Sequence, residues 1–249
     1  NDKVEIEFTT RGAQPYSVKI NDYKAYDSTD LYLIKPDMSQ MGISIFAGEN
    51  INTRDFIFNV AEHNDSTIVM QLPFTGGGYI QQKYWLTEGS YMMQNELSFV
   101  NMDGIIPRNV SMFDIDWSVV IPRLEKGYKN EKQYSKLDIY DSGDKKPEEI
   151  GRGRDDSERI DTKFKWFAFH QQFFSAIMTS GTEFASADLD VKYFAEDDPT
   201  HNLMTCSARL RSDFQPGSDN IVLPYKFYFG PNDYRTLKSY DQKYEKIIP

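Results

Sequence analysis

The chain has 249 residues, with 39% hydrophobic and 14% aromatic content and a formal net charge of −10. Its length and hydrophobic content suffice for one substantial core. The negative charge argues against a nucleic-acid partner and against strong adhesion to anionic lipid, because both depend on clustered Lys and Arg. The single cysteine, Cys206, excludes an internal disulfide and a multi-cysteine zinc site, and its strand-like surroundings predict a buried side chain.

Short alternating or apolar runs recur along the chain with turn residues between them. Strands are predicted at residues 4–8, 16–20, 31–34, 42–46, 56–60, 67–72, 79–86, 91–100, 115–121, 135–140, 165–174, 191–194, 204–210 and 222–229. Strands at this spacing indicate an antiparallel sandwich or barrel, and the lack of an apparent fixed-period repeat favours an open sandwich over a propeller. In the run 56–60, a period of two predicts that Phe56, Phe58 and Val60 share a buried face.

Two segments between the predicted strands are typical of loops. The three glycines at 76–78 predict a hairpin loop, and they do not form a phosphate cradle because no Lys-Ser/Thr pair and no helix follow them. Residues 141–161 are dense in Gly, Lys, Arg, Asp and Glu. Such a composition predicts a long, mobile surface loop.

The tail of the chain, residues 232–249, has the one clear helical pattern. Tyr234, Leu237, Tyr240 and Tyr244 recur at three-and-four spacing behind a capping pair of Asn and Asp. We expect this stripe to pack on the sandwich. No run approaches the roughly 20 apolar residues of a membrane-spanning helix. Because the chain starts without Met, has no signal peptide and stops within a helical pattern, we expect it to be a piece of a longer protein.

The sequence shows little catalytic chemistry. The three histidines, His63, His170 and His201, are far apart and form no spaced pair, so no metal site is indicated. The pairs Asp114 with Asp116 and Asp188 with Asp190 each share one strand face and could form an acid/base or calcium site, although a solvated face is favoured in so acidic a chain. No G-x-S-x-G nucleophile motif is present. We predict no catalytic, metal-binding or cofactor-binding residues.

The segment from Trp166 to Ala176 reads WFAFHQQFFSA, with two glutamines between aromatic residues. Alone, it predicts a largely buried strand and its turn. The order of its residues resembles the W-x-A-x-x-Q-Q-(Y/F)-F signature in the large periplasmic domain of YidC-type membrane protein insertases (Oxa/YidC/Alb family) of Gram-negative bacteria. The runs EIEFTTRGA at 5–13 and YKFYFGPNDY at 225–234 resemble that domain's first strand and its closing strand with a Gly-Pro break. The IMTS run at 177–180 departs from the Trp and Pro of better-known members.

The resemblance implies a fold and a function. The fold would be all-β, an antiparallel β-supersandwich of the galactose mutarotase-like kind with a C-terminal α-helix. Residues 1–249 would form a single periplasmic domain of a bacterial multi-pass inner-membrane protein, with the helical tail leading to the next transmembrane helix. The domain would help insertion and folding of inner-membrane proteins by contacting Sec translocon subunits and nascent inner-membrane proteins, with no catalytic residues and no cofactor.

The resemblance also directs attention to candidate contact residues. They belong to the signature segment and the terminal helix, and each could equally be core: Trp166, Phe169, Phe173, Phe174, Tyr234, Leu237, Tyr240 and Tyr244. Two other readings remain open. One is a carbohydrate-binding or aldose-epimerase-like protein of the same fold, which would need an acid and a base converging on one anomeric centre. The other is a purely structural domain.

Overall fold

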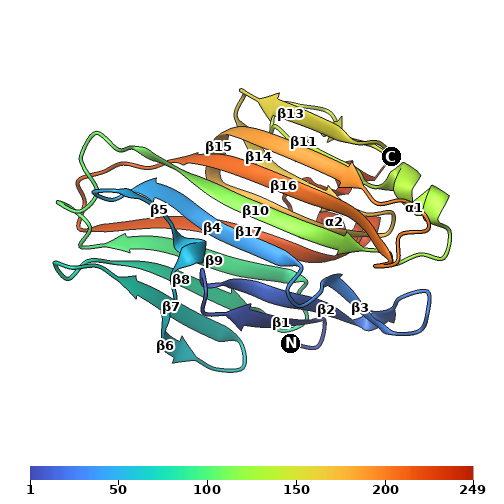
Figure 1. Ribbon diagram of the computed structural model, residues 1–249, viewed down its shortest axis with the longest axis horizontal. Coiled ribbons are helices and arrows are strands. Elements are labelled where there is room, and N and C mark those ends of the chain that lie inside the picture. The colour runs from blue at the N-terminus through green and yellow to red at the C-terminus, as the bar shows by residue number, and fades with distance from the viewer. Residues whose placement is uncertain (249) are drawn as a thin grey trace.

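The computed structural model describes residues 1–248 and consists mainly of β-strands (Figure 1). The strands are β1 (Val4–Thr9), β2 (Gln14–Lys24), β3 (Asp30–Ile34), β4 (Ser39–Phe46), β5 (Asn50–Asn52), β6 (Asn59–His63), β7 (Thr67–Pro73), β8 (Tyr79–Leu86), β9 (Met92–Val100), β10 (Met112–Pro122), β11 (Lys136–Tyr140), β12 (Glu148–Ile150), β13 (Asp156–Ile160), β14 (Phe164–His170), β15 (Phe174–Tyr193), β16 (Asn202–Asp213) and β17 (Asn220–Pro231). The helices are η1 (Thr53–Asp55), α1 (Tyr128–Tyr134), α2 (Tyr234–Ser239) and η2 (Tyr244–Ile247).

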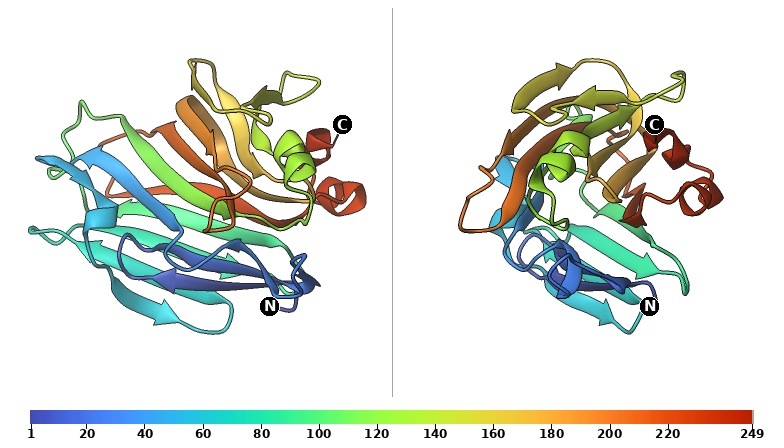
Figure 2. Two further views of the ribbon diagram at one scale, coloured as in Figure 1. Left: turned by 45° about the vertical axis from the view of Figure 1, so that its right-hand side comes forward. Right: turned by 90° about the vertical axis from the view of Figure 1, so that its right-hand side faces the viewer.

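The strands form two hydrogen-bonded sheets with antiparallel pairing throughout. A small sheet has the order β1-β2-β3, and a 14-stranded sheet runs β5-β4-β10-β16-β15-β17-β9-β8-β7-β6, with β11 to β14 attached beside it. The large sheet curls over on itself, and the small sheet lies against it (Figures 1 and 2). This arrangement confirms the predicted antiparallel β-supersandwich.

The long strand β15 joins the two halves of the large sheet. Its first part, up to Ser180, pairs with β14 and β17, whereas its second part, from Phe184, pairs chiefly with β13 and β16. The change of partners falls at Gly181. A Cβ atom at Gly181 would lie 2.5 Å from Pro224 Cγ, so only glycine fits where the two strands approach so closely.

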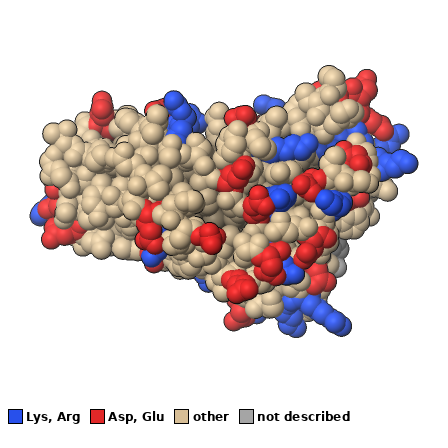
Figure 3. All heavy atoms as spheres, turned by 90° about the horizontal axis from the view of Figure 1, so that it is seen from below, with Lys and Arg blue, Asp and Glu red and all other residues tan. Residues whose placement is uncertain are grey.

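Charged side chains are unevenly distributed over the face seen from below. They are dense toward the end that carries α1, and toward the opposite end they are sparser and lie mainly along the edges (Figure 3). The figures also place the β2–β3 loop, α1 and α2 together at one end of the molecule (Figures 1 and 2). We call this end the terminal end.

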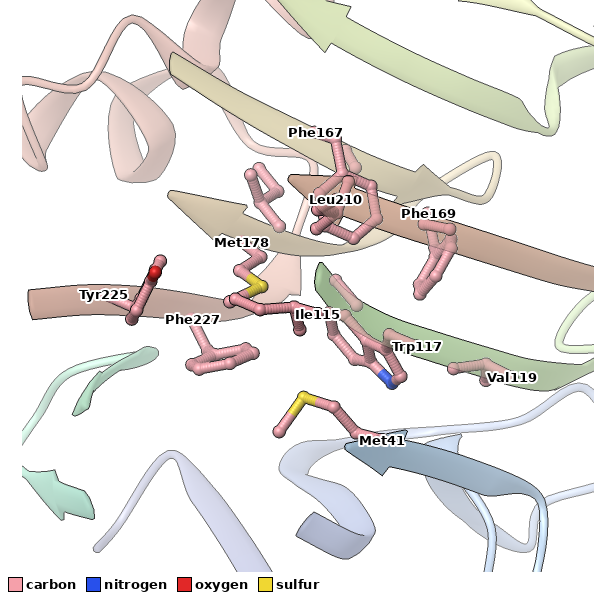
Figure 4. Packing of buried hydrophobic residues seen from close by; sticks show 14 of the residues in the cluster. Met41, Ile115, Trp117, Val119, Phe167, Phe169, Met178, Leu210, Tyr225 and Phe227 are labelled. Carbon is pink, nitrogen blue, oxygen red and sulfur yellow. The ribbon is translucent and has the colours of Figure 1, made fainter. Parts of the chain in front are cut away.

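The core lies between the facing halves of the large sheet. Trp117 of β10 is its centre, with ring centroids of Phe169, Phe227 and Phe167 at 4.9, 5.5 and 5.8 Å (Figure 4). All four side chains are buried. Trp117 keeps its one polar atom satisfied, because Nε1 donates to Ser39 Oγ at 3.1 Å. Phe167 and Phe169 of the signature segment therefore pack around the centre of the core.

Most predicted strands are present, but residues 56–60 do not form the predicted strand. Phe56 and Val60 are exposed, and Phe58 alone is buried. The reason is that η1 ends just before Phe56, and Phe58 N donates to Thr10 O at 2.8 Å, which pulls this residue inward. Strand β6 begins only at Asn59. The predicted hairpin loop at 76–78 is confirmed, because it connects β7 to β8.

The predicted loop at 141–161 is partly wrong, because it contains β12 and β13. Ile150 pairs with Leu137 of β11, and Ile160 pairs with Ala187 of β15. Both isoleucines are buried and hold the two strands on the sheet. Two apolar residues in a highly charged segment are therefore sufficient to anchor it. The short helix α1 was not predicted at all.

The predicted helix at 232–249 is also shorter than expected. It divides into α2 and η2, because Asp241 and Lys243 adopt φ angles of 53° and 62°, in the left-handed region. Asp233 caps α2 through its carboxylate, which accepts a hydrogen bond from Thr236 N at 2.8 Å. The final residue of the predicted helix, 249, lies outside the described residues.

Candidate contact surface at the terminal end

The turn between β14 and β15 carries the two glutamines of the signature. Gln171 is buried, and its Nε2 donates to Pro122 O at 2.9 Å, at the end of β10. Its own amide donates to Phe174 O at 2.9 Å and closes the turn. Gln172 is half-buried, and Phe173 is 52% exposed. The two glutamines thus differ in burial.

Asn232 ties this turn to the start of the C-terminal segment. Its Nδ2 donates to Gln171 O at 2.9 Å, its backbone amide donates to Phe173 O at 2.7 Å, and its Oδ1 accepts from Ser175 Oγ at 2.7 Å. Three hydrogen bonds from one residue fix where the chain leaves β17. The signature turn and the terminal segment therefore form one structural unit.

The segment after Asn232 packs onto the sandwich through aromatic rings. Tyr244 is fully buried and lies 5.8 Å from the rings of both Trp166 and Tyr228. Trp166 Nε1 donates to Gln242 O at 3.0 Å. The hydroxyl of Tyr240 accepts a hydrogen bond from Tyr91 N at 2.8 Å. The predicted packing on the sandwich is confirmed for Leu237, Tyr240 and Tyr244, whereas Tyr234 is exposed.

The structure separates the eight candidate contact residues by exposure. Trp166, Phe169, Phe174, Leu237 and Tyr244 are buried and are unavailable to a partner in this fold. Tyr240 is half-buried, and Tyr234 is 50% exposed. Of the eight, Phe173 and Tyr234 alone have exposed rings, so a contact role for them stays a prediction. The proposed use of the five buried residues is corrected, because their rings fill the core and the base of the terminal segment.

Sequence reasoning missed Tyr23 of β2, which is 37% exposed. Its ring meets Phe174 edge-on at a centroid distance of 5.1 Å, next to Phe173. We call Tyr23, Phe173 and Tyr234 the aromatic rim. Nothing in the sequence pattern links Tyr23 to the other two, because its contact is with Phe174, a residue 151 positions further along the chain.

A buried charged cluster lies behind the signature turn. His170 is hydrogen-bonded through Nδ1 to Asp138 Oδ2 at 2.6 Å, and Lys136 Nζ lies 3.3 Å from Asp138 Oδ1. Lys136 also pairs with Glu149, whose pKa is lowered by this lysine and Arg152 against the opposing effect of burial. His170 and Asp138 are 6% and 0% exposed. A sugar ring cannot reach this His–Asp pair.

The paired aspartates of β10 face solvent and are matched by arginines of β16. Arg211 forms two hydrogen bonds to Asp114 at 2.9 and 3.2 Å, and Arg209 forms one to Asp116 at 2.8 Å. The aspartate charges are thus neutralised within the sheet, as expected for a solvated face rather than for a cation site. The complementary spacing of Asp114 and Asp116 against Arg209 and Arg211 was a signal that sequence reasoning overlooked.

No group of three or more His, Cys, Asp or Glu side chains able to hold a metal ion occurs within residues 1–248. His63 lies on β6, and His201 lies in the turn before β16. The backbone oxygen of His201 accepts a hydrogen bond from Arg123 N at 3.2 Å.

Cys206 is buried as predicted, and burial raises the pKa of its thiol. None of the helices in the described part of the chain has the length and apolar character needed to cross a membrane.

The fold belongs to the galactose mutarotase-like class of β-supersandwich. A putative aldose 1-epimerase from Escherichia coli K12 superposes with a TM-score of 0.55, covering 92% of this chain and 97% of that protein at 9% identity. A galactose mutarotase related enzyme from Lactobacillus acidophilus gives a TM-score of 0.52 at 10% identity, with 92% and 95% coverage. At such low identities these likenesses concern the fold alone.

Sequence comparison identifies the family. A family model described as the YidC periplasmic domain matches residues 1–249, and the chain belongs to this family. The membrane protein insertase YidC of Azobacteroides pseudotrichonymphae is 30% identical over 260 residues, covering 100% of this chain and 42% of that protein. The YidC of Porphyromonas gingivalis is 28% identical over 244 residues, covering 97% and 38%. The chain therefore spans about two fifths of the length of these relatives.

Proposed function

We propose that this chain is the periplasmic accessory domain of a membrane protein insertase and assists insertion and folding of inner-membrane proteins. The observation that carries the proposal is the match of residues 1–249 to the YidC periplasmic domain family. The helical segment after β17 is held on the sandwich by specific contacts, because the hydroxyl of Tyr240 accepts a hydrogen bond from Tyr91 N at 2.8 Å and Trp166 Nε1 donates to Gln242 O at 3.0 Å. A rigidly packed domain of this kind can present a fixed surface to other proteins.

The domain would work by contact and not by chemistry. Its buried histidine is held by Asp138, and the paired carboxylates of β10 are matched by arginines. An epimerase would need an acid and a base converging on an open site. These side-chain arrangements favour an accessory role over the sugar-processing alternative.

The aromatic rim is the surface that we assign to partners. Tyr and Phe rings supply much of the binding energy at protein interfaces, and exposed rings held on a rigid turn cost little entropy on binding. Phe173 sits on a turn fixed by Asn232, and Tyr234 follows that asparagine by two residues. The expected partners are periplasmic segments of the Sec translocon and of nascent inner-membrane proteins.

Photocrosslinking in cells tests this proposal in the full-length, membrane-anchored protein. Probes at Phe173 and Tyr234 are expected to give adducts to translocon subunits or nascent membrane proteins. A probe at Ile57 is the matched control, because this residue is 66% exposed and lies outside the aromatic rim. Adducts from Ile57 with none from the other two positions would assign contact to another face. No protein adduct from any of the three exposed positions would contradict the accessory role.

A further inference from the structure

The segment around α1 is basic, although the chain as a whole is acidic. Residues 123–134 contain four Lys or Arg against two Glu, whereas the whole chain has 28 Lys or Arg against 38 Asp or Glu. One of the two acids, Glu131, is fully buried, and burial raises its pKa to about 7, which reduces its negative charge at neutral pH. The surface of α1 therefore presents mainly positive charge.

Two of these cations, Lys129 and Lys132, line an open hollow of about 530 Å³. It is lined by Tyr128, Lys129, Lys132, Gln133, Arg152 and Gly153. Lys132 Nζ lies 5.8 Å from the Tyr128 ring centroid and 5.0 Å from that of Tyr193, so two rings hold it in place. Within residues 1–248, neither Lys129 nor Lys132 forms an ion pair, while Arg152 is paired with Glu149 at 3.3 Å. The hollow thus offers two unneutralised lysines and one shared arginine to an anion.

Exposed tyrosines accompany this hollow. Tyr23, Tyr26, Tyr134 and Tyr234 are the four exposed tyrosines of the described residues, and all belong to the β2–β3 region, α1 or α2 at the terminal end (Figures 1 and 2). Tyr26 N donates to Leu124 O at 3.0 Å, beside the basic segment. Tyr rings combined with Lys and Arg are typical of protein surfaces that lie at a lipid–water interface.

We propose that the α1 hollow binds the phosphate of an anionic phospholipid headgroup and that the surrounding tyrosines rest in the interfacial region. This inference rests on the proposed function, because a periplasmic domain of a membrane protein insertase works beside a lipid surface. The positive hollow is drawn to the lipid surface while the acidic remainder is repelled. This difference in charge between the α1 hollow and the rest of the domain turns α1 toward the lipid.

Vesicle flotation tests the inference with the 249-residue chain. The chain is mixed at low salt with vesicles of phosphatidylcholine alone or of equal parts phosphatidylcholine and phosphatidylglycerol. The test variant carries Lys129→Gln, Lys132→Gln and Arg152→Gln. The matched control carries Arg108→Gln, Lys163→Gln and Lys226→Gln, which removes the same charge away from α1. Lys129→Gln alone is included because this exposed side chain forms no ion pair within residues 1–248. Thermal unfolding verifies that each variant folds.

We expect the chain to float with the anionic vesicles and not with phosphatidylcholine alone. The test variant should lose at least about tenfold in lipid partitioning, and the control should lose far less. Equal losses in both triple variants, or no preference for anionic vesicles, would overturn the inference. Displacement by inorganic phosphate, but not by chloride at the same ionic strength, would assign the hollow to free phosphate and also overturn it. Because flotation involves no translocon, its failure would leave the crosslinking test of the proposed function unaffected.

Discussion

Gln171 and Gln172 are adjacent residues with the same side chain and different structural roles. Gln171 is buried and donates a hydrogen bond to Pro122 O, whereas Gln172 is half-buried. The same division separates Phe174, in the core, from exposed Phe173. The sequence could not make this distinction, because the alternation of strand residues stops at His170 and resumes at Phe174, and the hydrogen bonds of the turn decide the orientation between them.

The two glutamines provide a matched pair of variants. Gln171→Ala should lower the free energy of unfolding by about 1–3 kcal/mol, because Pro122 O is then left buried without a donor. Gln172→Ala should change it by less than about 0.5 kcal/mol, as substitutions away from structural features do. Urea unfolding followed by circular dichroism measures both. Equal effects of the two substitutions would contradict the structural role assigned to Gln171.

Glu131 makes the stability depend on pH. Burial raises the pKa of its carboxyl from 4.5 to about 7, so the folded state holds this proton more tightly than the unfolded state. Its contribution to stability is complete below about pH 4.5 and is lost as the pH rises through about 7, a loss of up to about 3 kcal/mol. Glu131→Gln cannot ionise and still accepts the hydrogen bond from Leu124 N. The variant should therefore unfold at higher urea than wild type near pH 8, with the gap closing near pH 4. A gap that does not vary with pH would refute this assignment.

At the scale of elements, the burial of particular side chains determines where strands form in segments whose sequence pattern did not predict them. The strands β8 and β9 were predicted almost to their ends, at 79–86 and 91–100. The strands that were missed or misplaced share a cause, because they are held by contacts between residues that are distant in the sequence. Ile150 and Ile160 hold β12 and β13 on strands that the sequence does not link to them, and Gly181 lets β15 change partners beside Pro224. Local patterns do not contain these contacts.

The C-terminal segment illustrates the same limit. Its apolar stripe correctly predicted packing, but α2 and η2 are joined by two left-handed residues that no helical periodicity reveals. Exposure then divides the stripe, because Leu237 and Tyr244 are buried and Tyr234 is exposed. The contact surface could therefore be predicted only as a region. Which rings face solvent required the three-dimensional structure.

Tyr244 and Tyr234 test this division. Tyr244→Ala should destabilise the fold by about 3–5 kcal/mol, because it removes a fully buried ring that packs on Trp166 and Tyr228. Tyr234→Ala should have little effect on stability and should weaken only partner contact. Chemical unfolding of the two variants, compared with wild type, gives the measurement. A large loss of stability in Tyr234→Ala would show that the aromatic rim is part of the folded core.

At the scale of the whole molecule, charge and exposed aromatics are distributed unevenly. The chain as a whole has a net charge of −10, yet α1 and its hollow are basic and the exposed tyrosines lie at the same end of the molecule. The signature turn is joined to the start of the C-terminal segment by Asn232. In the view of Figure 3, charged side chains are denser toward the terminal end than toward the opposite end. We propose that this asymmetry turns the terminal end toward the membrane surface.

Energy transfer to lipid measures this orientation directly in the full-length insertase that we propose. Donor dyes are placed on single cysteines introduced at Tyr134, at the terminal end, or at Ser218, in the turn before β17 at the opposite end, and the bilayer carries acceptor-labelled lipid. Native Cys206 is buried and should not compete for the label. The account predicts markedly stronger transfer from position 134 than from position 218. Equal transfer from both positions, or stronger transfer from 218, would contradict it.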